Sequence, residues 1–132
     1  MTTIGNPKLS VATDDNLQRA AVVVQCNVRF TDFEVNAMNR LGLRYTLRCR
    51  VVNKDLWYET TSLILEDVEL PRVPGAATAS EEVVFETAAP LDALREHMFT
   101  RDELFAELTL VNNETGAEQV ARSETQTIDL SA

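Results

Sequence analysis

The sequence predicts an all-β, mainly antiparallel fold: a two-sheet β-sandwich of about seven or eight strands with one short helix near 91–98. Apolar and polar residues alternate with period two along most of the chain, turn residues interrupt these runs often, and only one segment has helical spacing. A chain of 132 residues can bury one core and is too short for two ordinary domains. We therefore expect a single domain over 1–132.

The first half of the chain contains the clearest strand pattern. Residues 1–19 show no sustained alternation, and we expect a loosely ordered segment there. Alternation begins at Ala21 and changes phase by one residue after Thr31 and Asp32, which predicts a β-bulge or a tight bend. Residues 43–51 alternate cleanly, as an antiparallel strand with one solvated face does.

The middle of the chain predicts further strands around one long loop. Residues 57–70 are aromatic and β-branched enough for one or two strands. Two prolines, a glycine and small residues make 71–81 the predicted mobile loop. Residues 83–88 alternate again, and Pro90 fits the first position of the short helix at 91–98.

The C-terminal part predicts a hairpin. We expect a turn at 100–103, a strand to about Asn112, and a hairpin loop over 112–116. Residues 117–130 return from that loop and are rich in Thr, Ser and Gln. This polar composition predicts an edge strand.

Composition limits the classes of partner. The net charge of −9, from 21 acidic and 12 basic residues, repels phosphate backbones and argues against nucleic acid. No apolar run approaches the roughly 20 residues that span a bilayer, so no membrane role is expected. The N-terminal residues lack the pattern of a signal peptide, which favours a cytoplasmic protein.

Catalytic groups are scarce. His97 is the sole histidine, and Cys26 and Cys49 both fall in phase with apolar residues, where a buried thiol stays protonated and inert. We therefore predict no catalytic residues and no cofactor.

Calcium could use loop carboxylates at the end of a sandwich, and Asp32, Asp55 and Asp67 lie near predicted strand ends. The chain contains no calcium-loop motif, so no metal site is assigned.

The most specific feature is a row of arginines. Arg44, Arg48 and Arg50 share one face of a predicted strand, with Arg29 expected on a neighbouring strand. They either pair with acidic residues on adjacent strands or dock an acidic patch on a partner. Trp57 and Tyr58 are a second interaction candidate, because two adjacent residues of one strand cannot both face the core.

The leading hypothesis is a non-enzymatic sandwich that binds protein, as a homo-oligomer or an accessory subunit. Binding would use the arginine-bearing sheet face or an edge strand. The alternative is a small-molecule or calcium-binding sandwich with its site in the loops. A hydrolytic enzyme ranks third.

Overall fold

A computed structural model of the chain describes residues 2–14, 16–54, 59–94 and 102–128. These residues form nine strands and two helices. Their order is β1 (Thr3–Asp14), β2 (Arg19–Arg29), α1 (Asp32–Leu41), β3 (Tyr45–Lys54), β4 (Glu59–Ile64), β5 (Val68–Leu70), β6 (Ser80–Pro90), α2 (Leu91–Leu94), β7 (Asp102–Asn112), β8 (Glu118–Arg122) and β9 (Gln126–Ile128).

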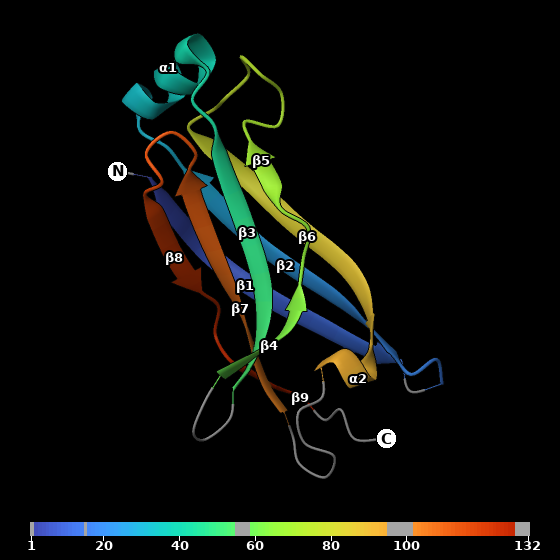
Figure 1. The fold of residues 1–132 in the computed structure, drawn as a ribbon. Coiled ribbons are helices and arrows are strands. Elements are labelled where there is room, and N and C mark those ends of the chain that lie inside the picture. Colours follow the sequence, from blue (N-terminus) through green and yellow to red (C-terminus); the bar gives the residue numbers. More distant parts are fainter. Residues whose placement is uncertain (1, 15, 55–58, 95–101, 129–132) are drawn as a thin grey trace.

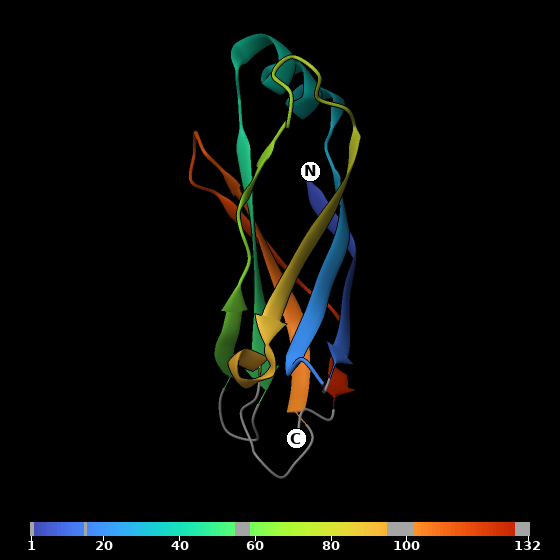
Figure 2. The same ribbon diagram turned by 90° about the vertical axis from the view of Figure 1, so that its right-hand side faces the viewer.

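Two antiparallel sheets face each other, which confirms the predicted all-β sandwich (Figures 1 and 2). Sheet A has the strand order β1-β2-β6. Sheet B is built on the central pair β3 and β7. Two short strands, β4 and β5, share the outer side of β3, and β8 and β9 share the outer side of β7.

The core lies between the sheets because the strands alternate in side-chain direction. On β2 the even-numbered residues face inward, and Val22, Val24 and Val28 are fully buried. On sheet B, Leu47 of β3 and Leu108 of β7 are fully buried opposite them. The period-two pattern of the sequence therefore identified the inward-facing side chains of β2, β3 and β7 correctly.

Residues 3–14 form a complete strand, so the expected loose N-terminal segment is wrong for this stretch. The alternation is broken because β1 contains a bulge: Gly5 pairs with Asn27 and Lys8 pairs with Gln25, leaving one extra residue on β1. Asn6, within the bulge, has a left-handed φ of 51°. The bulge puts the apolar residues before and after it in opposite phases.

The phase change after Thr31 is the start of helix α1, not a bulge or bend. Thr31 and Glu34 form a capping box: the Glu34 N–H donates to Thr31 Oγ1 at 3.2 Å, and the Thr31 N–H donates to Glu34 Oε1 at 2.8 Å. Gly42 ends the helix with a φ of 74°. The Thr-x-x-Glu spacing was visible in the sequence, and it explains the change of period. A second helix, α2, lies where the short helix was predicted, as far as Leu94.

The second oxygen of the Glu34 carboxylate joins the helix to sheet B, because it accepts a hydrogen bond from the Tyr45 hydroxyl at 2.9 Å. Partial burial alone would raise the pKa of Glu34, but the hydrogen bonds from Thr31 and Tyr45 outweigh it and lower the pKa.

Replacing the cap should destabilise the fold measurably. We expect Thr31→Ala to lower the free energy of unfolding by about 1 kcal/mol, as loss of an N-cap side chain does. The contribution of Glu34 is present above its unfolded pKa and is lost as the pH falls, because protonation removes a charged acceptor. Urea unfolding of Thr31→Ala and Glu34→Gln at neutral and acidic pH measures both effects. A Glu34→Gln penalty that did not shrink on acidification would contradict this account.

Two further segments differ from the expectation. The loop between β5 and β6 ends at Ala79 and not at 81, because β6 begins at Ser80. The Asn39 side chain of α1 accepts a hydrogen bond from the Ala77 N–H at 2.7 Å and donates one to the Ala77 carbonyl at 3.2 Å. The predicted final strand is divided into β8 and β9, because Ser123 between them bonds to the Ala106 backbone. Both helices of the described ranges are too short and too polar to cross a membrane.

Candidate interaction surfaces

The predicted arginine row is bonded to acceptors of the same chain. Arg48 lies on β3 and Arg44 directly precedes that strand. A carboxylate oxygen of Asp67 lies 3.7 Å from Arg48 Nε, and Arg44 donates to the Pro71 carbonyl at 3.3 Å. A partner docking on these two side chains would have to compete with these contacts.

Arg50 belongs to a cluster centred on Glu107 of β7, whose side chain is only 11% exposed. Arg50 and Arg122 of β8 each bond to a different Glu107 oxygen, at 2.8 and 2.9 Å. Arg122 also lies 3.4 Å from Glu59 and sits over the Phe105 ring, 5.1 Å from its centroid. One carboxylate held by guanidinium groups from both flanking strands fixes the pairing of three strands. Cross-strand pairing thus accounts for Arg50.

The other predicted interaction residues are not gathered with Arg48. Arg29 lies on β2 in sheet A, so its expected place on a strand beside the arginine row is wrong. The chain changes sheets between β2 and β3 through α1, a crossing that the alternating pattern does not predict. Trp57 and Tyr58, together with His97 and Asp55, lie outside the described residues.

The two cysteines are free thiols that face the core from opposite sheets. Burial raises the pKa of Cys26 to about 11. Burial also raises the pKa of Cys49, to about 12, and the neighbouring Cys26 adds to the shift. A thiol with so high a pKa carries almost no thiolate at neutral pH, and thiolate is the form that attacks substrates and binds metals.

Within the described ranges, no three His, Cys, Asp or Glu side chains gather closely enough to hold a metal ion. Asp32 lies in the first turn of α1, and Asp67 is engaged by Arg48.

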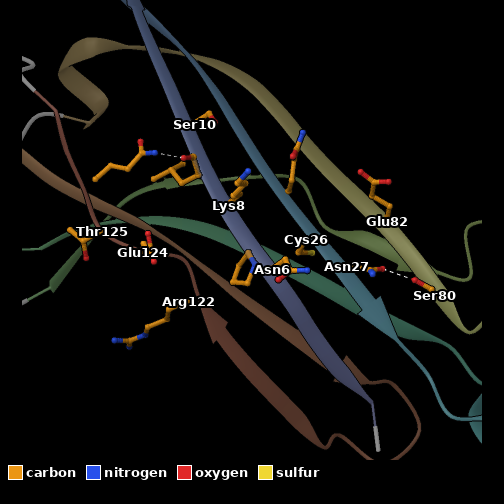
Figure 3. Close-up of a pocket in the computed structure, with 14 residues that line it drawn as sticks. Asn6, Lys8, Ser10, Cys26, Asn27, Ser80, Glu82, Arg122, Glu124 and Thr125 are labelled. Atoms are coloured by element: carbon orange, nitrogen blue, oxygen red, sulfur yellow. Dashed lines mark hydrogen bonds between the residues drawn. The ribbon is translucent and has the colours of Figure 1, made fainter.

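An open, polar groove of about 1200 Å³ follows the bulged part of β1 (Figure 3). Sheet A contributes Lys8, Asn27 and Glu82 to its lining, and the segment after β8 contributes Glu124. None of the described residues that line it is aromatic. The mixture of charges and amides suits a small polar ligand in contact with water.

Part of the hydrogen-bonding capacity of this groove is already used. Ser80 Oγ donates to Asn27 Oδ1 at 2.8 Å (Figure 3). The Gln126 side-chain amide donates to the Leu9 carbonyl. The second bond ties the edge of β1 to β9, so it joins the two sheets along this side of the sandwich.

The opposite edge of sheet A, along β6, is open. β6 pairs with β2 over its whole length, and the Glu82 carbonyl accepts from the Arg72 guanidinium at 3.4 Å, so that carbonyl points away from β2. Because backbone groups alternate in direction along an antiparallel strand, Val84, Glu86 and Ala88 also aim N–H and C=O away from the sheet. No other described segment makes a backbone hydrogen bond to these three residues. Figure 2 shows β6 crossing the foreground, with this edge uncovered by the drawn ribbons.

The side chains of β6 divide into two rows. Val83 and Phe85 are buried in the core, whereas the side chains that alternate with them are exposed on the outer face of sheet A. The exposed row has its backbone groups on the open side of the strand, and we name it the β6 rim. It consists of Glu82, Val84, Glu86 and Ala88.

The alternation of residues 83–88 predicted the β6 strand but not its position at an edge. Strand order depends on contacts between distant segments, and one sequence carries no signal for it. The predicted edge at 117–130 is found over its described strands, since β8 and β9 pair only with β7 among the described strands.

No protein-family model matches the sequence, and no curated protein sequence matches it. Among solved structures, the chain is similar to a protein named ApaA from Bordetella pertussis, with 10% identity, 97% of this chain and 92% of that chain covered, and a TM-score of 0.42. It is also similar to the structural-genomics target SoR45, with 8% identity, coverage of 96% and 84%, and a TM-score of 0.42. Similarity at this level assigns no function to the chain.

Proposed function

We propose that this chain is a non-enzymatic protein-interaction module, and that it binds by adding an extended segment of a partner to the free edge of β6. The observation that carries the proposal is the row of outward-facing backbone groups at Val84, Glu86 and Ala88 without a backbone partner in the described chain. An unpaired row of this kind is a template for another strand, in which main-chain hydrogen bonds supply affinity and alternate side chains supply specificity.

The other edges carry features that oppose strand addition. β1 is bulged, contains Pro7, and has its Leu9 carbonyl occupied by Gln126. Each outer edge of sheet B is divided between two short strands. Beside β3 these are β4 and β5, of six and three residues, and beside β7 they are β8 and β9, of five and three residues. β6 is one unbroken strand of eleven residues whose open stretch begins at Val84, and Pro90, which lacks an N–H, lies at its end.

The test removes one N–H from the free edge. Val84→Pro deletes a donor that points away from β2, and proline is tolerated in an edge strand at such a position. Val120→Pro is the matched control, because Val120 is exposed on β8 and its N–H also points away from β7. The Ala117 carbonyl accepts from the Asn112 N–H of β7, and backbone groups alternate in direction, so those of Val120, three residues later, face away from β7. Random peptides of about nine residues, displayed on phage, would be selected against the immobilised chain.

We expect the selected peptides to lose at least about tenfold in affinity for Val84→Pro and to bind Val120→Pro as they bind the unmodified chain. Circular dichroism and thermal unfolding check that both variants remain folded. Peptides that bound Val84→Pro undiminished, or a selection that enriched none, would overturn the proposal. Peptides sensitive only to Val120→Pro would move the interaction to sheet B.

A second candidate function is binding of a small polar ligand, which the groove beside β1 favours. A ligand of the native state raises the melting temperature by mass action, so thermal scans with amino acids, sugars and calcium salts test it directly. For the setting of either function we propose the cytoplasm, since two buried free thiols suit a reducing compartment.

A further inference from the structure

We infer that the occupant of the β6 edge is an extended segment of a different protein, with a lysine or arginine at two positions four residues apart and an apolar β-branched residue midway between them. This inference rests on the proposed function and specifies the partner. It follows from the charges of the β6 rim, their spacing and the absence of cations on the strand.

The β6 rim carries one glutamate on each side of Val84. Glu82 and Glu86 are exposed on either side of Val84, and neither carboxylate forms an ion pair with a described residue. On β2, the cross-strand neighbours of these glutamates are Asn27 and Val23, which bring no compensating charge. Opposite charges directly across an antiparallel pair are stabilising, whereas like charges are not.

The spacing translates into a partner pattern. Side chains on one face of a strand recur every second residue, so an added strand places its residues i, i+2 and i+4 beside Glu82, Val84 and Glu86. Val84 is 39% exposed, and a β-branched neighbour would cover it. The partner positions between these residues lie on the other face of the added strand.

Arg72 sets one end of the contact. Its guanidinium already bonds to the Glu82 carbonyl, so the continuous open stretch begins at Val84. A partner strand must either end there or displace this single 3.4 Å contact at an exposed position. Glu86 therefore carries more of the charge recognition than Glu82.

A second copy of the chain fits this edge poorly. β6 contains no lysine or arginine, so pairing it with β6 of another copy gives no rim glutamate a cation in any register. A two-fold axis at Val84 would place Glu82 opposite Glu86 twice, and an axis at Glu86 would place that residue opposite itself. The net charge of −9 on each copy adds to the repulsion and favours a basic partner.

The experiment compares two fluorescein-labelled peptides by anisotropy: Thr-Lys-Thr-Val-Thr-Lys-Thr, and the same peptide with glutamate in place of both lysines. We expect the basic peptide to bind the unmodified chain at least about tenfold more tightly. The double variant Glu82→Lys/Glu86→Lys should reverse the order. The control Glu114→Lys/Glu118→Lys changes the net charge equally at the β7–β8 hairpin, and the original order should persist there.

The other possible outcomes would contradict the charge pattern, the edge function or the choice of partner, respectively. Equal binding of both peptides, abolished by Val84→Pro, would overturn the charge inference and leave the edge function standing. A basic preference lost equally in the control variant would mean attraction to net charge alone. Binding of neither peptide, or binding insensitive to Val84→Pro, would remove the proposed function as well. A dimer in native mass spectra that Val84→Pro dissociates would identify a second copy as the occupant.

Discussion

Both cysteines of the native protein should react with N-ethylmaleimide at least about 100-fold more slowly than they do in the unfolded chain. The pKa of Cys26 is raised from 9.0 to about 11 and that of Cys49 from 9.0 to about 12. Near pH 8 these shifts alone reduce the thiolate fraction by about 100-fold and 1000-fold. Burial then restricts access, since each residue is only 3% exposed.

Mass spectrometry of quenched samples, with and without concentrated guanidinium chloride, measures the two rates. Cys26→Ala and Cys49→Ala assign the residual labelling to single sites. Rapid labelling of one thiol in the folded chain would contradict the burial of that residue and would return thiol-based catalysis to consideration. Slow labelling of both removes the nucleophile that a cysteine hydrolase would need.

The same shifts make stability depend on pH in the alkaline range. A thiol whose pKa is higher in the folded state favours folding fully below the pKa of the unfolded chain. Its contribution falls as the pH rises through 9.0 towards about 11 and about 12, because the unfolded chain then ionises first. We expect the alkaline loss of stability to be smaller in Cys49→Ala than in the unmodified chain.

The sequence predicted those parts of the fold that depend on local periodicity. The inward positions of β2 and β3 follow from strict alternation, and the hairpin after Asn112 follows from its turn residues. Two of the wrong predictions, the loose segment at β1 and the bulge or bend at α1, have one cause. A bulge between Gly5 and Lys8 and a capping box at Thr31 each change the phase of the apolar pattern, and a phase change alone does not distinguish a bulge from a helix. Only the Thr-x-x-Glu signature separates the two cases.

The candidate site was less predictable because it depends on strand order. Arg48 and Arg50 form a charged row that is visible in the sequence, but their acidic neighbours come from residues up to 57 positions away. Conversely, the β6 rim has an unremarkable sequence of alternating acids and small apolar residues. It becomes a candidate surface only because β6 ends up beside β2 and beside no other described strand.

Phe85→Ala should destabilise the protein by about 3–5 kcal/mol, the largest effect we expect from any single substitution in β6. The ring is 4% exposed and belongs to the main core, so its removal loses apolar burial and leaves a cavity. For a domain of this size the melting temperature should fall by roughly 10–20 °C. Thermal and urea unfolding measure the loss. Phe85→Leu, which should cause a smaller loss, replaces the alanine variant in this test if that variant does not fold.

The neighbouring substitution Val84→Ala should change stability by less than about 0.5 kcal/mol, because Val84 faces solvent. The contrast between these adjacent residues tests whether the inner side chains of β6 stabilise the sandwich while the outer side chains contribute little to its stability. A rim that stability does not require is free to carry the recognition pattern inferred above. A large penalty for Val84→Ala would mean that the rim is covered by part of this chain and is therefore closed to a partner.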